Sequence, residues 1–350
     1  MITPSQTPAP GPTPGPPDPV WAHPHRAPML YPLILRTWAY SWWQPVVGLL
    51  VMIVCALVLA PLVLLPVLAI GILIQGGDFE QSLTAALDQT KITPAAMLYL
   101  NLTLASMILI AWFVVRAFHR LRPRWLMSVR PGVRWRFFGV CMALSVIAMI
   151  AQLVVGSLLP VDANDIGGHL VHVDGTVIAL AIVVLLTTPL QAMGEEYGFR
   201  GYAMQAFGTL ADGVARRCGL STGAAERAAV VLAIGASALL FALAHGTQNF
   251  PLFFDRFAFG ILAGYLVYRT GGLEAGIAMH IWNNLIAFGF GIAFGQVQEQ
   301  LTEHQASWWN LPITVTQYGV YLVLVIWVAR RMGIDNRTRP PALAPLSPAV

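Results

Sequence analysis

The fold class is decided by residues 181–200, AIVVLLTTPLQAMGEEYGFR, an apolar run that ends in two adjacent glutamates and an arginine. A helix that crosses the ~30 Å hydrocarbon core of a bilayer needs about 20 such residues. The whole chain has the same character, since 57% of its 350 residues are hydrophobic and only 10% are charged. A water-soluble domain carries roughly a quarter charged residues. The bilayer must therefore be the solvent for most of this chain.

Apolar runs of sufficient length recur along the sequence and predict an all-α fold, a polytopic transmembrane helical bundle of about eight spans. Pro61 and Pro66 fall inside the first run, so we expect a kink or a local break there. Gly260 and Gly264 have the spacing that lets helices approach closely, although this spacing is frequent in membrane helices of every function. The predicted spans are 46–74, 95–115, 137–159, 176–206, 228–249, 253–269, 273–295 and 311–330.

Arginine placement predicts the orientation, because cytoplasmic loops of membrane proteins carry an excess of Lys and Arg. Segment 116–136 is the most basic part of the chain, and 216–227 and 330–339 add further arginines. The intervening loops, 78–88 among them, carry acidic residues, so eight spans leave both termini in the cytoplasm. Compact loops and the lack of a targeting segment favour a bacterial inner membrane. The arginines form no continuous face, so we expect the lipid bilayer as a partner and no nucleic acid.

Glu195 and Glu196 are informative because each charge inside a bilayer costs about 2.5–3.5 kcal/mol on insertion scales. Glu196 and Arg200 are four residues apart, so they share a helix face and can form an ion pair. Glu195 is turned about 100° from Glu196. We expect it to point at neighbouring helices without a cation, which suits a general base.

Two later helices offer partners for Glu195. The fifth predicted span contains Phe-Ala-Leu-Ala-His at 241–245, and the seventh contains His280 and Asn284 on one face. Glu195 could then deprotonate a water while His280 and Asn284 donate hydrogen bonds to the developing oxyanion. His245 could hold the water, or Glu195, His245 and His280 could bind a divalent metal such as zinc. Each element alone has a plain structural explanation, but chance is a poor explanation for all three in this order.

The same segments carry a family resemblance. Glu195-Glu196-Tyr-Gly-Phe-Arg200, Phe241-x3-His245 and His280-x3-Asn284 resemble the three signature motifs of the CAAX protease and bacteriocin-processing family of intramembrane endopeptidases, which is related to the Ras-converting CAAX endopeptidase. The resemblance covers about a third of the chain, from the fourth to the seventh predicted span. Glu196 and Arg200 look like supporting residues of the first motif. The sequence lacks a His-Glu-x2-His helix, the pattern of many zinc proteases. The motifs are therefore compatible with a site that binds a metal and with one that does not.

The resemblance implies an eight-helix membrane fold with the site in a cavity below the membrane surface. It also implies that Glu195 is the water-activating base, helped by His245, and that His280 and Asn284 stabilise the oxyanion. We therefore expect an intramembrane protease, and a metalloprotease if zinc is bound. It would hydrolyse a peptide bond in a membrane-associated protein or peptide, with a C-terminal CAAX-like sequence as one candidate substrate.

Two other functions are compatible with the same residues. The first is a non-catalytic membrane scaffold or bacteriocin self-immunity protein, in which the motifs shape a cavity that binds a peptide or partner. The second is a proton-coupled transporter, which would also place Glu and His inside helices, but the chain shows no internal repeat.

The chain divides into five predicted parts by composition and motif. Residues 1–28 are rich in proline and are expected to stay solvated as a disordered tail. The other four parts are the N-terminal membrane spans at 29–175, a catalytic helical core at 176–295, the last span at 296–331 and a second disordered tail at 332–350.

Overall fold

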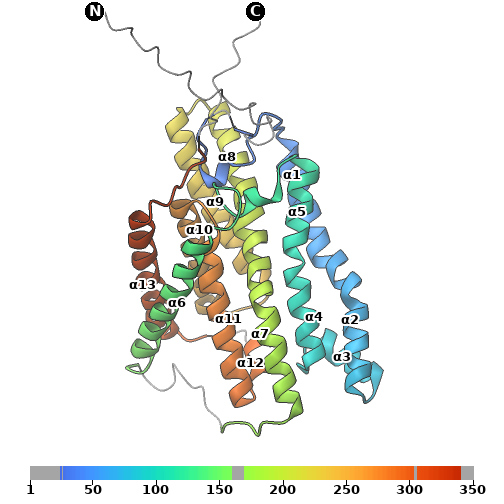
Figure 1. The fold of residues 1–350 in the computed structure, drawn as a ribbon. Coiled ribbons are helices and arrows are strands. Elements are labelled where there is room, and N and C mark those ends of the chain that lie inside the picture. The colour runs from blue at the N-terminus through green and yellow to red at the C-terminus, as the bar shows by residue number, and fades with distance from the viewer. Residues whose placement is uncertain (1–23, 26, 160–168, 303–305, 340–350) are drawn as a thin grey trace, which may run out of the picture.

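The computed structural model describes residues 24, 25, 27–159, 169–302 and 306–339 (Figure 1). The regular structure in this described part of the chain is all helical, with only two isolated β-bridges and no strand. Eight of its helical stretches are long and apolar enough to cross a membrane. The predicted all-α polytopic bundle of eight spans is therefore confirmed.

Several of the eight spans consist of more than one helical segment, and short helices lie between others. The first span runs from Trp43 to Gln75, and the fourth is the longest, from Gly175 to Arg217. The segments in chain order are η2 (Tyr31–Leu33), α1 (Trp43–Val54), η3 (Cys55–Leu59), α2 (Ala60–Gln75), α3 (Phe79–Leu87), α4 (Pro94–Ala105), α5 (Met107–Phe118), η4 (Pro123–Leu126), α6 (Trp135–Gly156), α7 (Gly175–Glu195), η6 (Glu196–Ala203), α8 (Met204–Arg217), α9 (Thr222–Ala244), α10 (Phe250–Thr270), α11 (Glu274–Phe294), α12 (Val297–Thr302) and α13 (Asn310–Arg331).

Short polar residues begin the spans that carry the predicted site. Asp174, Ser221 and Asn249 precede α7, α9 and α10, and each side chain accepts a hydrogen bond from the backbone N–H three residues later. These bonds satisfy amide groups that the first turn of a helix leaves unpaired. Gly271 ends α10 with φ of 66°, a left-handed conformation that glycine adopts without steric cost. The turns between spans are thus fixed by local sequence.

The irregularity predicted in the first span is a widened helix rather than a break. Residues Cys55–Leu59 form the π-helix η3, directly before Pro61 in the first turn of α2. Proline has no backbone N–H to donate to the carbonyl four residues earlier, and a π-turn shifts the hydrogen bonds by one residue. The span therefore continues to Gln75.

Small residues bring α9 and α10 into close contact. A Cβ atom at Gly260 would lie 2.7 Å from the Cα atom of Ala238, and one at Gly264 would lie 3.2 Å from a side-chain methyl of Ile234. The close approach predicted for this glycine pair is therefore confirmed. It matters for the site because α9 leads to His245 and α10 carries aromatic side chains that line the same region.

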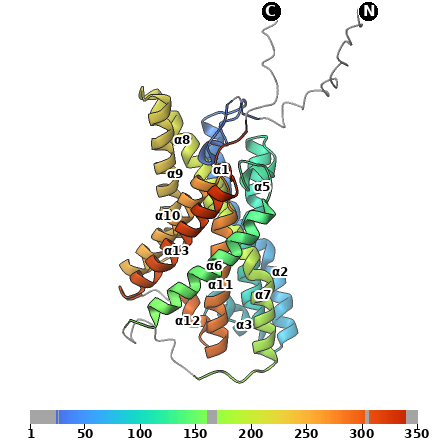
Figure 2. The same ribbon diagram turned by 60° about the vertical axis from the view of Figure 1, so that its left-hand side comes forward.

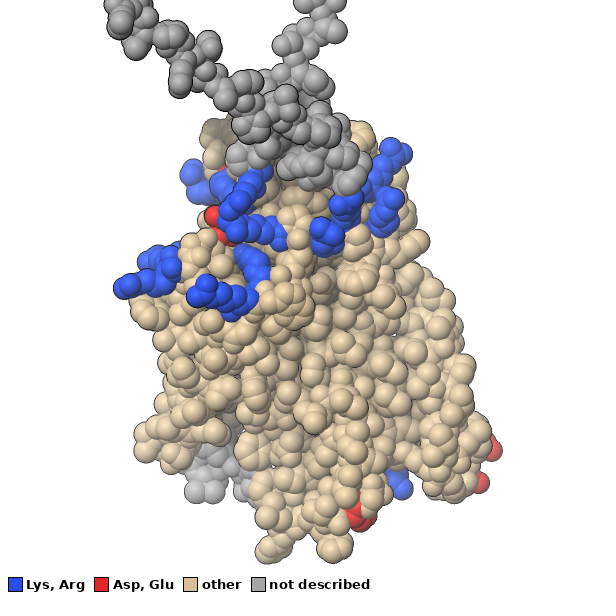
Figure 3. All heavy atoms as spheres, viewed as in Figure 1, with Lys and Arg blue, Asp and Glu red and all other residues tan. Residues whose placement is uncertain are grey.

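Arginines gather at one end of the bundle, the arginine-rich end, where both ends of the described chain also lie (Figure 1, Figure 3). Residues 332–339 pack there, although the sequence predicted a solvated tail from 332 onward. Arg337 pairs with Glu226 at 2.8 Å, and Asp335 pairs with Arg130 at 2.7 Å. The oppositely charged partners on other segments, Glu226 and Arg130, could not be identified from the sequence. The remainder of both predicted tails, 1–23, 26 and 340–350, lies outside the described residues.

The fourth span is longer than predicted and the fifth ends earlier. The fourth continues through α8 to Arg217, and the fifth, α9, ends at Ala244. Figure 2 shows α8 and the start of α9 extending past the neighbouring helices at the arginine-rich end. Glu195 and His245 then lie at nearly equal distances along the chain from the turn at 218–221. The predicted span limits would place Glu195 and His245 at different depths in the membrane. The observed limits remove this difference.

Candidate active site

The two adjacent glutamates lie where the fourth span changes its helical form. Glu195 is the last residue of α7, and Glu196 is the first residue of the π-helix η6. Both side chains are buried, with 6% and 0% of their surface exposed. Short π-helical segments inside α-helices occur frequently at functional sites. No pattern in the sequence indicated the π-helix η6.

Glu196 forms the predicted ion pair with Arg200. The distance from Nη1 of Arg200 to Oε1 of Glu196 is 3.0 Å, and both side chains are fully buried. The guanidinium carbon of Arg200 also lies 3.9 Å from the ring centre of Phe241 and 5.1 Å from that of Phe259. A desolvated cation over aromatic faces is stabilised by the ring electrons. Arg200 is therefore held by one carboxylate and two rings.

His280 lies between the two carboxylates. Its Nδ1 atom is 3.0 Å from Oε1 of Glu196, and its Nε2 atom is 3.4 Å from Oε2 of Glu195. An imidazole from a later helix was expected beside Glu195, and His280 makes that contact. The two carboxylates do diverge along the helix, but the imidazole enters from α11 and contacts both. Gly276, one turn earlier on α11, leaves the space, because a Cβ atom there would lie 2.8 Å from Oε2 of Glu196.

A buried amide that sequence reasoning missed completes the contacts of Glu195. Nε2 of Gln191 donates a hydrogen bond to Oε1 of Glu195 at 2.5 Å. Nδ2 of Asn284 donates in turn to Oε1 of Gln191 at 2.9 Å. Asn284 thus reaches Glu195 through Gln191. The one available sequence signal was the spacing, since Gln191 is four residues before Glu195 and shares its helix face.

His245, the residue that directly follows α9, also lies at the site. Its Nδ1 atom lies 2.8 Å from the backbone oxygen of Phe241, and its ring centre is 4.6 Å from that of Phe241. Burial lowers the pKa of His245, while the negative charge of Glu195 opposes this effect. Phe241 also contacts the ring of His280 at 6.1 Å between centres. One aromatic side chain thus lies against both histidines and Arg200.

The metal site considered for Glu195, His245 and His280 needs three ligands that converge. Within the part of the chain that the structure describes, no three His, Cys, Asp or Glu side chains come close enough to hold a metal ion. The residues present do not fit a three-ligand metal site. No metal is therefore given a role in the reaction proposed for this site.

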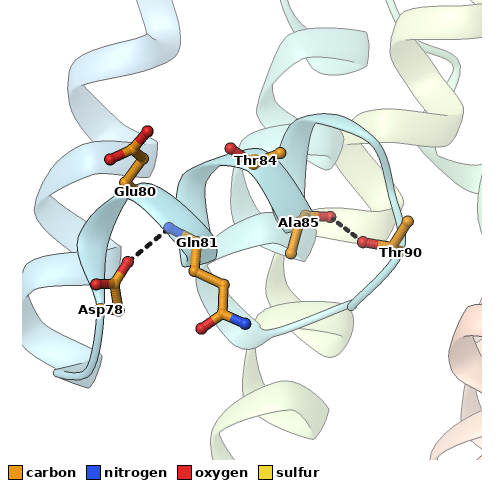
Figure 4. A pocket seen from close by; sticks show the side chains of 6 residues that line it. All are labelled: Asp78, Glu80, Gln81, Thr84, Ala85 and Thr90. Carbon is orange, nitrogen blue, oxygen red and sulfur yellow. Dashed lines mark hydrogen bonds between the residues drawn. The ribbon is translucent and has the colours of Figure 1, made fainter.

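A surface depression lies in a different part of the molecule, along α3 (Figure 4). Its polar groups serve the local turns. The backbone N–H of Gln81 donates to Asp78 at 2.7 Å, and the hydroxyl of Thr90 donates to the backbone oxygen of Ala85 at 3.4 Å. It is separate from the site around Glu195. The depression is lined by Asp78, Glu80, Gln81, Thr84, Ala85 and Thr90.

Comparisons with known proteins agree with the motifs. No curated protein and no solved structure gives a match to the chain. Residues 177–286 match a family model described as type II CAAX prenyl endopeptidase Rce1-like. The matched range contains all six predicted site residues, namely Glu195, Glu196, Arg200, His245, His280 and Asn284. The resemblance is confirmed, since residues 177–286 of this multi-pass membrane protein are similar to the Rce1-like family of type II CAAX prenyl endopeptidases.

Proposed function

We propose that the chain is an intramembrane endopeptidase that hydrolyses a peptide bond in a membrane-associated protein or peptide. One observation carries the proposal, namely a buried carboxylate, Glu195, that lies 3.4 Å from the imidazole of His280 inside an apolar bundle. Ionisable groups within the membrane are costly and usually mark functional sites. The match of residues 177–286 to a CAAX prenyl endopeptidase family supports the type of reaction.

In the proposed reaction Glu195 is the general base. Its Oε2 atom takes a proton from a water molecule while the water oxygen forms a bond to the carbonyl carbon of the substrate. The carbonyl oxygen becomes an oxyanion, which accepts hydrogen bonds from the amide of Asn284 and from His280. Glu195 then returns the proton to the departing amine, the carbon–nitrogen bond breaks, and the carboxylate is restored. His245 holds the attacking water from the end of α9.

Glu196 and Arg200 act through His280 rather than on the substrate. Glu196 accepts the hydrogen bond of Nδ1, so the other ring nitrogen, Nε2, faces Glu195. A hydrogen bond to one nitrogen sets the protonation and orientation of an imidazole. Arg200 balances the charge of Glu196, which has no exposure to water. Both are positioning residues in this proposal.

The family match suggests a first substrate to test, a peptide whose C-terminal CAAX sequence carries a farnesyl group. The lipid would place the scissile bond at the membrane. The orientation follows the positive-inside rule, with the arginine-rich end in the cytoplasm of a bacterial cell. Both termini would then lie in the cytoplasm.

The test is Glu195→Gln in the purified, folded chain with a farnesylated CAAX peptide. We expect release of the C-terminal tripeptide, measured by mass spectrometry, to fall at least about 100-fold, because a general base is lost. Glu299→Gln on α12 is the matched control, since Glu299 is exposed and lies outside the site. Unchanged cleavage by Glu195→Gln would remove Glu195 from the mechanism.

The same variant separates a protease from a non-catalytic scaffold or self-immunity protein. A scaffold would keep its cellular activity with glutamine at 195, because the side chain retains its size. A protease would lose it. C-terminal peptides of the membrane proteome, compared with and without the active chain, would then identify the natural substrate.

A further inference from the structure

Gln191 is the residue that joins Glu195 to Asn284. It lies one turn before Glu195 on α7, and only 5% of its surface is exposed. Its amide nitrogen donates to Glu195, and its amide oxygen accepts from Asn284. Both ends of the side chain are therefore engaged inside the bundle, in a buried bond to Glu195 and a partly buried bond to Asn284.

The two bonds allow one orientation of the Gln191 amide. A flipped amide would set an oxygen against Oε1 of Glu195, and a nitrogen against the nitrogen of Asn284. Both contacts would bring like groups together, acceptor to acceptor and donor to donor. The donor side of Gln191 is thus committed to Glu195.

We infer that Gln191 is a positioning residue for the proposed hydrolysis. It holds Oε1 of Glu195 and leaves Oε2, the oxygen that faces His280, to take the proton of the attacking water. This inference rests on the proposed role of Glu195 as the base. It adds that Gln191 selects which carboxylate oxygen reacts and couples the base to the oxyanion donor Asn284.

The inference predicts how catalysis changes when the amide is removed. Gln191→Leu replaces the carboxamide with an apolar side chain of similar size, which cannot donate to Glu195. A hydrogen bond to a charged group in a buried site is strong enough for its loss to slow the reaction about 10- to 100-fold. Because Gln191 does not touch the substrate, kcat should fall while KM stays close to its normal value.

A matched control separates positioning from general packing. Gln317 on α13 is 3% exposed, and its amide donates to Asn283 on α11 at 2.6 Å, beside Asn284 in sequence. Gln317→Leu therefore removes a comparable buried amide bond between helices without touching Glu195. We expect both variants to lower the thermal unfolding midpoint, but only Gln191→Leu to lower kcat.

The decisive measurement is kcat for Gln191→Leu, Glu195→Gln and the double variant, with the farnesylated CAAX peptide in detergent micelles. If Gln191 acts through Glu195, the double variant is no slower than Glu195→Gln alone. Full activity of Gln191→Leu beside an inactive Glu195→Gln overturns the inference and leaves the proposed function standing. Equal losses of kcat in Gln191→Leu and Gln317→Leu also overturn it. Activity that survives Glu195→Gln overturns the proposed function itself. Should Gln191→Leu fail to fold, Gln191→Met provides the same comparison with a more flexible side chain.

Discussion

The buried pair of Glu196 and Arg200 can be tested without any substrate. Arg200→Met leaves the carboxylate of Glu196 with no water and no guanidinium, and Glu196→Gln leaves the guanidinium without its carboxylate. Breaking a fully buried pair on one side typically costs about 3–5 kcal/mol of unfolding free energy. The double variant leaves no uncompensated charge. Its main loss is the contact of Arg200 with the ring of Phe241, at 3.9 Å, worth about 2 kcal/mol when desolvated.

The double variant should therefore be more stable than the sum of the single losses predicts, by about 3 kcal/mol or more. The assay is reversible unfolding in mixed detergent micelles, followed by circular dichroism. A control cycle uses Arg130 and Asp335, a pair at 2.7 Å whose side chains are 45% and 38% exposed. That pair should couple by less than about 1 kcal/mol. Losses at Glu196 and Arg200 that add within about 0.5 kcal/mol would refute the reasoning.

Two further predictions concern packing and pH. Gly194→Ala should lower the free energy of unfolding by about 1–3 kcal/mol, because its Cβ would meet the backbone oxygen of Leu104 on α4. Gly289→Ala is the control and should cause no such loss, because the space around Gly289 is open. Equal melting midpoints of the two variants would contradict this prediction. Burial lowers the pKa of His119, which contacts the hydroxyl of Tyr202 at 3.0 Å, to about 4. The unfolded chain then binds more protons than the folded one between about pH 6.5 and 4. Stability should fall as the pH drops through that window, and the curve of His119→Phe should be flatter.

The number of spans could be predicted from sequence because hydropathy measures immersion in the membrane directly. The Glu196–Arg200 pair could be predicted for a similar reason, since i, i+4 contact is a local property of helices. The limits of the fourth and fifth spans could not. Helix α8 mixes apolar residues with Gln205, Asp212 and two arginines, so no hydropathy signal shows that the helix continues to Arg217. Hydropathy alone does not distinguish a helix that continues beyond the membrane from a loop.

The tertiary contacts of Glu195 could not be predicted from the sequence either. Its separation from Glu196 around the helix axis was predicted, but the position of the His280 ring depends on how closely α11 approaches. Gln191 was overlooked for a different reason. A glutamine carries no charge, so its burial has no evident cost in a sequence, although its two hydrogen bonds connect two predicted site residues.

Two neighbouring carboxylates can share one imidazole only if the ring lies between their diverging side chains. That requires the backbone of α11 to come close to η6, and Gly276 permits it because any side chain there would collide with Glu196. One of the two charges is balanced locally, because Glu196 and Arg200 form an ion pair at 3.0 Å and together make a neutral group. Such a neutral group can be buried at far less cost than its members separately. In the proposed reaction, the polar groups that would activate the water thus lie together before a substrate arrives, which is the preorganisation that electrostatic catalysis depends on.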